Sequence, residues 1–190
     1  MKIGILGGSF NPIHHGHLLM AQAAMEGMGL DEVIFVPAAC SPHKADKDLA
    51  PAKDRLAMAR AAIKGEAQFS LSDCEIKRGG KSYSIDTVRY FRELRPKAEL
   101  FWIIGADSLS TLHTWKDIKE ILKIASFIAV NRPGCKQVKP KAGIKINQVM
   151  MPGVEISSSD IRRRLKAKKS IRYLTTDPVI RYILKKNLYA

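Results

Sequence analysis

Gly7-Gly8-Ser9-Phe10-Asn11-Pro12-Ile13-His14-His15-Gly16-His17-Leu18 is the stretch that decides the fold of this 190-residue chain. It follows Lys2–Leu6, a short apolar segment that predicts a buried strand, and leads into a segment of helical period over Gly16–Met28. Two glycines after a strand let the backbone approach a ligand closely. A helix start directs free amides and a positive dipole end at the same place. The stretch therefore predicts a phosphate site formed by Gly7, Gly8, Ser9, Phe10 and Gly16.

His14 and His17 lie three residues apart on either side of Gly16, which at a helix start places them on one face. In phosphoryl-type transfer an enzyme mainly positions the reactants and stabilises charge on the equatorial and leaving oxygens. Two imidazole donors suit that task, so we predict both histidines to be catalytic. The alternatives are a tight turn with surface histidines and a histidine-only metal site. The joint occurrence of strand, glycine turn and His-x-Gly-His at a helix start favours the phosphate site.

The remaining sequence alternates short apolar or β-branched segments with segments of helical period. The predicted strands are Lys2–Leu6, Glu32–Pro37, Phe69–Ile76, Leu100–Ile104, Phe127–Asn131 and Ile146–Met151. The predicted helices are Gly16–Met28, Ala52–Lys64, Ile85–Leu94, Trp115–Lys123, Ser158–Lys168 and Pro178–Lys186. This alternation predicts an α/β fold, a Rossmann-like doubly wound parallel sheet with helices on both faces. Ligands of such sheets bind beyond the carboxyl ends of the strands, where the strand order reverses.

The end of the chain carries clear helix signals. Thr175-Thr176-Asp177-Pro178 offers a capping residue, an early acid and a proline near the first helical position. The apolar residues that follow share one helix face. We predict a core over residues 1–155 and a small C-terminal helical appendage over residues 156–190, which docks on the core as one compact unit.

The net charge of +14 is unevenly distributed. Residues 1–131 carry 17 Lys and Arg against 15 Asp and Glu, whereas residues 132–190 carry 15 against 3. A basic segment attracts nucleic acid, an anionic membrane surface or small polyphosphates, and charge alone does not choose among them. We assign no specific role to the basic run after Arg162.

The N-terminus and the cysteines bear on location. Met1-Lys2 runs directly into the first predicted strand, and no apolar run approaches the ~20 residues that span a bilayer. Cys40, Cys74 and Cys135 are far apart and have no metal-ligand spacing, which is typical of free thiols in a reducing compartment. We expect a cytoplasmic protein with no membrane partner.

A second candidate phosphate site lies at Ile156-Ser157-Ser158-Ser159-Asp160-Ile161-Arg162. Serine hydroxyls and free amides at a helix start bind anions, and Arg162 adds a charged donor one turn later. A plain serine N-cap is the alternative, and by itself it would be favoured. The presence of the first site favours phosphate binding by Ile156, Ser157, Ser158, Ser159 and Arg162.

These two stretches resemble motifs of a known superfamily. The first resembles the His-x-Gly-His motif of nucleotidyltransferases related to class I aminoacyl-tRNA synthetases. The longer match over residues 7–18 is similar to bacterial nicotinate mononucleotide adenylyltransferases, which more often have Thr in place of Ser9 and Asp in place of Asn11. The second stretch resembles the Ile-Ser-Ser-Thr-x-Ile-Arg element that holds ATP phosphates in this superfamily, with Ser159 in place of the usual Thr.

Further segments match the same family and imply sites for the mononucleotide. Ser41-Pro42-His43-Lys44 follows the second strand, and the resemblance implies phosphate binding by Lys44. Ser82–Thr87 is similar to the family's Ser-Tyr-Thr-x-Asp-Thr stretch. Gly105–Leu109 and Trp115 match its Gly-x-Asp-Ser-Leu…Trp pattern, in which the acid could bind ribose hydroxyls and the indole could stack on a pyridine ring. The residues implied for the mononucleotide are Lys44, Tyr83, Ser84, Thr87, Asp107, Trp115, Lys116 and Arg132.

The resemblance covers essentially the whole chain and implies a reaction. ATP and nicotinate mononucleotide would give deamido-NAD and pyrophosphate in NAD biosynthesis, with Mg²⁺ held by the ATP phosphates and water rather than by a protein cage. It implies small-molecule partners and no nucleic acid, and it leaves homo-oligomerisation and the preference for nicotinate over nicotinamide open.

Two other functions compete with this interpretation. Pantetheine-phosphate adenylyltransferases share both phosphate motifs, but that family is shorter and lacks the elements at Ser82–Thr87 and Trp115. A basic nucleic-acid-binding module on Arg162–Arg172 is an alternative of a different class, although it has no interleaved aromatic residues. Such a module would bind DNA or RNA with an affinity that falls steeply with salt and does not need His14 or His17.

Overall fold

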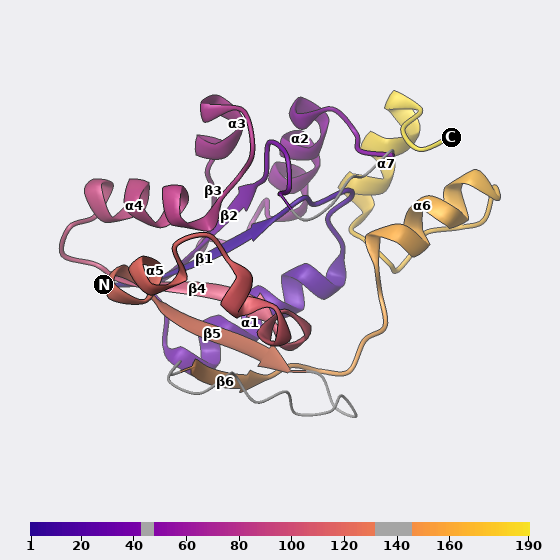
Figure 1. Ribbon diagram of the computed structural model, residues 1–190. Helices are drawn as coiled ribbons and strands as arrows, with labels where there is room; N and C mark the ends of the chain where they lie inside the picture. The colour runs from indigo at the N-terminus through magenta and orange to yellow at the C-terminus, as the bar shows by residue number, and fades with distance from the viewer. Residues whose placement is uncertain (43–47, 132–145) are drawn as a thin grey trace.

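One sheet of six parallel strands organises the chain, in the order β3-β2-β1-β4-β5-β6 (Figure 1). The structure, a computed structural model, describes residues 1–42, 48–131 and 146–190. The strands are β1 (Lys2–Gly8), β2 (Glu32–Pro37), β3 (Phe69–Leu71), β4 (Glu99–Gly105), β5 (Ser126–Asn131) and β6 (Ile146–Met150). The helices are α1 (His15–Met28), α2 (Ala52–Ala62), α3 (Cys74–Arg78), α4 (Ser84–Leu94), α5 (Ile118–Ile124), α6 (Ser158–Lys166) and α7 (Asp177–Lys186).

The strand order reverses at β1, which confirms the predicted doubly wound sheet. The chain runs outward from β1 through β2 to β3 and then returns to the other side of β1 with β4. The register pairs Gly8 with Pro37 on one side of β1 and Ile5 with Trp102 on the other. The carboxyl ends of β1 and β4 therefore form the edges of the crevice where such sheets bind ligands.

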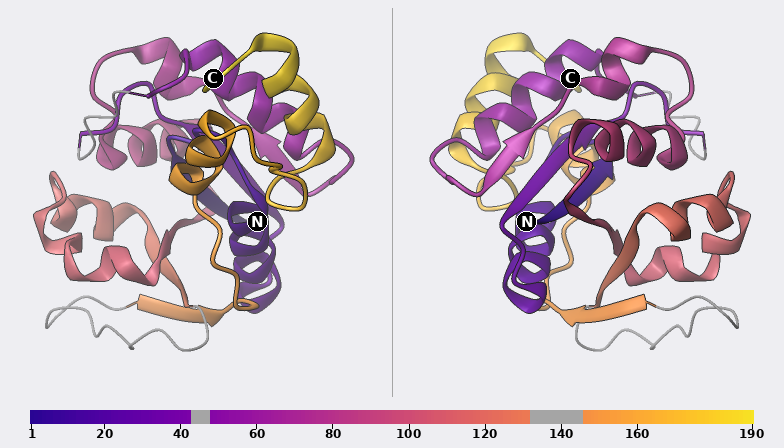
Figure 2. Two further views of the ribbon diagram at one scale, coloured as in Figure 1. Left: turned by 90° about the vertical axis from the view of Figure 1, so that its right-hand side faces the viewer. Right: turned by 90° about the vertical axis from the view of Figure 1, so that its left-hand side faces the viewer.

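Two hydrophobic cores cover the two faces of the sheet, because successive side chains of a strand point to opposite faces. Leu6 packs in the core with residues of α1, α2, α6 and α7. Ile5 packs in the other core with residues of α3, α4 and α5. Figure 2 shows these helices on both sides of the strands.

The C-terminal helices complete the first of these cores. Ile161 of α6 and Val179 of α7 are both 0% exposed and belong to the cluster that contains Leu6. In Figure 1, α7 (yellow) lies beside α2, and the Tyr182 hydroxyl donates a hydrogen bond of 2.8 Å to Oδ1 of Asp54 on that helix. Residues on both sides of the predicted boundary at residue 155 thus share one core.

Two predicted elements were wrong in part. The strand predicted over Phe69–Ile76 ends at Leu71, and the short helix α3 follows it. Near the start of α3 the Cys74 amide lies 3.4 Å from Oγ of Ser72, a local contact that competes with extension of the strand. The helix predicted to start at Trp115 starts at Ile118 instead, because Trp115 is extended and Asp117 adopts a left-handed conformation (φ 52°).

The contact between α7 and α2 predicts a stability change. Tyr182→Phe should lower the free energy of unfolding by about 1–2 kcal/mol, because the buried Asp54 carboxylate loses a hydrogen-bond donor. Urea unfolding would measure this, with Tyr90→Phe at an exposed position as the control. An unchanged midpoint would contradict the structural role of the contact.

The same contact predicts how stability depends on pH. Burial, then the hydrogen bond to Asp54, raises the pKa of Tyr182 above its usual value of 10.0. A pKa that is raised on folding means that the contact stabilises the folded protein fully below about pH 10. That stabilisation is lost as the pH rises through the raised pKa. Tyr182→Phe should remove this alkaline loss from the pH profile of unfolding.

Candidate active site

A cavity of about 790 Å³ opens at the carboxyl ends of β1 and β4, at the reversal of the strand order. Its walls come from the loop after β1, the start of α1, the start of α4, the turn after β4 and the start of α6. It is lined by the predicted site residues Gly7, Gly8, Ser9, Phe10, His14, Gly16, His17, Tyr83, Ser84, Asp107, Trp115, Lys116, Ile156, Ser157, Ser158, Ser159 and Arg162. Segments predicted separately from the sequence are thus brought to one place.

His14 and His17 are held together at the start of α1. His14 is the N-cap residue and is 5% exposed. Its amide donates to Nδ1 of His17 at 3.2 Å, and the His17 amide donates to the His14 carbonyl at 2.9 Å. The ring centroids lie 3.7 Å apart. Because Nδ1 of His17 accepts a hydrogen bond, the proton of its neutral ring lies on Nε2, which leaves Nε2 as the donor.

Two glycines leave space where a side chain would collide with this site. A Cβ atom on Gly16 would lie 3.0 Å from Nδ1 of His14 and 3.6 Å from the Ile156 carbonyl oxygen. A Cβ atom on Gly7 would lie 2.9 Å from the ring of Trp102. Gly16 therefore leaves room for the His14 ring, whereas a Cβ there would make only an ordinary contact with the Ile156 carbonyl.

The second motif contacts the first directly. The Ser157 hydroxyl accepts from the Asp160 amide at 3.1 Å and so caps α6. The Ser158 hydroxyl donates to the Pro12 carbonyl at 2.8 Å, and Nη1 of Arg162 donates to the Asn11 carbonyl at 2.8 Å. The amides at the start of α6 and those after β1 thus face one cavity, an arrangement that suits a polyphosphate.

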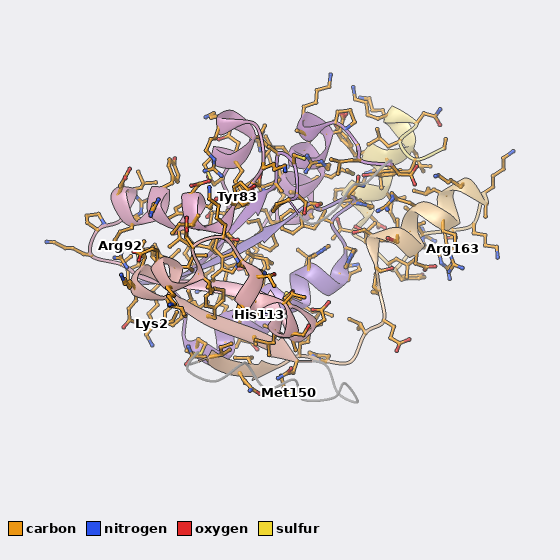
Figure 3. The ribbon with its side chains drawn as sticks, viewed as in Figure 1. Lys2, Tyr83, Arg92, His113, Met150 and Arg163 are labelled. Atoms are coloured by element: carbon orange, nitrogen blue, oxygen red, sulfur yellow. The ribbon has the colours of Figure 1, made fainter. Side chains whose placement is uncertain are left out.

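Aromatic and charged side chains form the opposite side of the cavity. The Lys116 ammonium lies 4.5 Å from the ring centroid of Tyr83, which precedes α4 and is labelled in Figure 3. Trp115 packs edge-on against Trp102, with centroids 6.4 Å apart. Asp107 is exposed in the turn after β4, and its Oδ1 accepts from the Ser108 amide at 3.1 Å.

Thr87 is the described site prediction that the structure does not bring to the cavity lining. It is 0% exposed, and its hydroxyl donates to Oε1 of Glu75 at 2.5 Å and accepts from Nη2 of Arg78 at 3.3 Å. Glu75 is 3% exposed and does line the cavity. Thr87 therefore does not line the cavity itself. It orients the carboxylate of Glu75, which does line the cavity and which the sequence did not indicate.

Lys44 and Arg132, together with His43, lie outside the described residues. Their predicted contacts with the mononucleotide phosphate stay predictions. Ser41 and Pro42, which precede His43 and Lys44 in the sequence, line the cavity.

Other residues that sequence reasoning missed hold the loop after β1 in place. Asn11 is 2% exposed, and its Oδ1 accepts from the Ala50 amide at 3.0 Å and from the Tyr189 hydroxyl at 2.7 Å. Arg55 of α2 is 1% exposed and hydrogen-bonds the same loop at Ser9. The contacting residues are separated by between 39 and 178 positions in the sequence, so no local sequence pattern predicts these contacts.

Part of the basic run after Arg162 is paired with acids. Hydrogen bonds from Arg163 and Arg164 lower the pKa of the Asp160 carboxyl. The Lys166 ammonium lies 2.8 Å from Oδ1 of Asp48, and this contact lowers the pKa of Asp48. Arg163, labelled in Figure 3, lies on α6. Three basic side chains of this run therefore have acidic partners within the chain, so their charges do not require a nucleic-acid partner.

The described residues contain neither a candidate metal cluster nor a membrane-spanning helix. In residues 1–42, 48–131 and 146–190, no group of three or more His, Cys, Asp or Glu side chains could hold a metal ion. Over the same part of the chain, no helix has the length and apolar character needed to cross a membrane.

Comparison with solved structures confirms the fold. The chain superposes with a TM-score of 0.81 on the Plasmodium falciparum nicotinic acid mononucleotide adenylyltransferase complexed with NaAD, at 23% identity, covering 99% of this chain and 97% of that one. A putative nicotinate-nucleotide adenylyltransferase from Vibrio parahaemolyticus gives a TM-score of 0.72, at 23% identity, over 100% and 96% of the two chains.

Sequence comparison adds the family. The family model described as cytidylyltransferase-like matches residues 5–164. A probable nicotinate-nucleotide adenylyltransferase from Exiguobacterium sibiricum is 45% identical over the full length of both chains. One from Opitutus terrae is 44% identical over 100% of this chain and 98% of its own. Because these relatives are 44–45% identical over the full length of the chain, it belongs to the nicotinate-nucleotide adenylyltransferase family of nucleotidyltransferases.

Proposed function

We propose that this protein transfers the adenylyl group of ATP to nicotinate mononucleotide, giving deamido-NAD and pyrophosphate. An oxygen of the mononucleotide phosphate attacks the α-phosphorus of ATP, and the bond to the leaving pyrophosphate breaks opposite to it. No enzyme side chain is covalently modified. The observation that carries the proposal is that one cavity joins the His-x-Gly-His helix start, the serine-capped start of α6 and the aromatic side around Trp115. Relatives 44–45% identical bear the corresponding name.

ATP is assigned to the side of the cavity where the two phosphate motifs meet. The amides after β1 and at the start of α6 surround the triphosphate, and Arg162 adds a charged donor. His14 and His17 donate to oxygens on which charge develops as the α–β bond breaks. The contact of Arg162 with the Asn11 carbonyl supports this assignment, because it links the two motifs.

Nicotinate mononucleotide is assigned to the opposite side. Trp115 offers an indole face for the pyridine ring, and Asp107 is available to ribose hydroxyls. The start of α4 at Ser84 presents free amides beside Tyr83 and Lys116, which suits an anionic carboxylate better than a neutral amide. Lys44 and Arg132 remain part of the proposal as cations for the mononucleotide phosphate.

Magnesium accompanies ATP in this proposal. Mg²⁺ bound to the triphosphate would supply neutralisation of the negative charge on the leaving pyrophosphate. Two carboxylates, Glu75 and Asp107, line the cavity, and Glu75 already accepts a hydrogen bond from Thr87. Phosphate oxygens and water are therefore its natural ligands, as Mg²⁺ at nucleotide sites requires few protein groups. We place the reaction in the cytosol, which the free thiols of Cys40 and Cys74 support.

The proposal is tested by following the products directly. The purified protein, incubated with ATP, Mg²⁺ and nicotinate mononucleotide, should release pyrophosphate and deamido-NAD in equal amounts, measured by coupled assay and mass spectrometry. Hydrolysis of ATP without a dinucleotide product, or no turnover at all, would contradict it. With ATP chiral at the α-phosphorus through a single sulfur substitution, inversion of configuration is expected, and retention would indicate a covalent intermediate.

Trp115 predicts a substrate-selective effect. Trp115→Ala should raise KM for nicotinate mononucleotide about tenfold and change KM for ATP much less, because a stacking contact is worth about 1–1.5 kcal/mol and lies on the mononucleotide side. Steady-state kinetics with each substrate varied in turn would measure both constants. Tyr173→Ala, at a side chain 81% exposed, is the control. Equal increases for both substrates would remove Trp115 from the mononucleotide site.

A further inference from the structure

Arg55 is an unusual residue in this fold, because it is a full positive charge among the largest fully buried side chains. It lies on α2 and is 1% exposed. Burying a guanidinium is costly unless its donors are hydrogen-bonded. The structure satisfies them with main-chain carbonyls: Nε donates to Ala50 at 3.0 Å, Nη1 to Ser9 at 2.9 Å and to Ala38 at 2.6 Å, and Nη2 to Ala39 at 3.2 Å.

These carbonyls belong to different walls of the cavity. Ser9 directly follows β1, whereas Ala38 and Ala39 follow β2 and lead to Ser41 and Pro42. Four of these five residues line the cavity: Ser9, Ala38, Ser41 and Pro42. A single nitrogen, Nη1 of Arg55, therefore ties the loop after β1 to the loop after β2.

The position of Arg55 coincides with the end of the strand ladder. The last hydrogen bond between the two segments runs from the Ala38 amide to the Gly8 carbonyl at 2.9 Å. Beyond it the chain turns away at Phe10, which adopts a left-handed conformation (φ 45°). Arg55 thus continues the cross-link between the two segments where backbone pairing stops.

We propose that Arg55 is a positioning residue for adenylyl transfer, which fixes the distance between the ATP loop after β1 and the mononucleotide loop after β2. The inference rests on the proposed function, which places ATP at the loop after β1 and the mononucleotide in the same cavity, whose wall includes Ser41 and Pro42 after β2. In-line attack requires the reacting atoms about 3–3.5 Å apart, and a displacement of about 1 Å costs up to a hundredfold in rate. Arg55 contributes by holding the relative placement of the two substrates, not by touching either.

A positioning role has a specific kinetic signature. Each loop keeps its own binding groups when Arg55 is replaced, so each substrate should still bind. Only their alignment in the transition state should suffer. Arg55→Met should therefore lower kcat about tenfold, while KM for ATP and for nicotinate mononucleotide each change less than about threefold.

Matched variants separate this role from a purely structural one. Arg55→Lys keeps the positive charge but has fewer hydrogen-bond donors. Its kcat should lie between that of Arg55→Met and that of the wild type. Arg60→Met, on the exposed side of the same helix, should leave kcat unchanged. Calorimetric titration of each variant with nicotinate mononucleotide, and thermal unfolding, report binding and folding independently of turnover. If Arg55→Met does not fold, Arg55→Lys alone decides, with a predicted loss of about threefold in kcat.

The outcomes are distinguishable from failure of the proposed function. A wild-type protein without adenylyl transfer would refute the function itself. An active wild-type protein with unchanged kcat in folded Arg55 variants would overturn the positioning role. The same holds if KM for both substrates rises with kcat unchanged, because Arg55 would then support binding and not alignment.

Discussion

Replacing His17 with alanine should lower kcat by about 10²–10³, the loss expected when a donor to developing charge is removed. Nδ1 of His17 accepts from the His14 amide, so we assign the Nε2–H of its ring as the donor to the oxygens of the transferred adenylyl group. The effect belongs to kcat because the donor is needed most where charge accumulates on the leaving oxygen. Steady-state rates of pyrophosphate release would measure it.

His15 provides the control for that experiment. It follows the N-cap residue, its amide donates to the Leu174 carbonyl at 3.1 Å, and it is not among the cavity-lining residues. His15→Ala should leave kcat near the wild-type value, and both variants should unfold at similar temperatures. An unchanged kcat in His17→Ala would remove His17 from catalysis, and a collapse of the fold would assign it a structural role instead.

Gly16→Ala should lower kcat about tenfold without lowering stability. The new Cβ would lie 3.0 Å from Nδ1 and 3.1 Å from Cε1 of His14. The His14 ring is buried and has the His17 ring 3.7 Å away, so it cannot shift without disturbing its partner. A displacement of a few tenths of an ångström is enough to misalign a donor.

Stability should change little in this variant. Alanine favours the helix over glycine by up to about 1 kcal/mol, which offsets the crowding at His14. Thermal unfolding together with kcat would show the two effects separately. A variant that is as active as the wild type would mean that the His14 ring is not constrained as described. A large loss of stability would mean that crowding, and not misalignment, explains any loss of rate.

The local features of the fold could be predicted from the sequence because they depend on neighbouring residues. The His-x-Gly-His start of α1 and the serine cap of α6 each lie within a few residues, and the structure places them as predicted. The glycine turn predicted after Leu6 was wrong, because Gly7 and Gly8 are the last residues of β1 and pair with β2. The doubly wound sheet followed from the alternation of strands and helices. The least accurate element boundaries were the end of β3, where a local contact at Ser72 competes with the strand, and the start of α5, which is preceded by Trp115 packed on Trp102.

The framework behind the site could not be predicted, because it depends on contacts distant in the sequence. From the sequence, Arg55 would be an ordinary exposed polar residue of an amphipathic helix. The fold instead buries its side chain among main-chain carbonyls of two loops. Thr87 matched a substrate-contacting position in the family, but the turn of α4 directs its hydroxyl at Glu75. Residue type and spacing indicated the groups that line the cavity, whereas the groups that hold them required the three-dimensional structure.

The identity of the acceptor is the central claim, since the phosphate motifs are shared by the whole superfamily. The most direct test is kcat/KM for pyrophosphate release with ATP, Mg²⁺ and one acceptor at a time: nicotinate mononucleotide, nicotinamide mononucleotide or phosphopantetheine. We predict the highest value for nicotinate mononucleotide, a lower value for the amide and no turnover of phosphopantetheine. A higher kcat/KM for phosphopantetheine or for nicotinamide mononucleotide would contradict the assignment of the acceptor site.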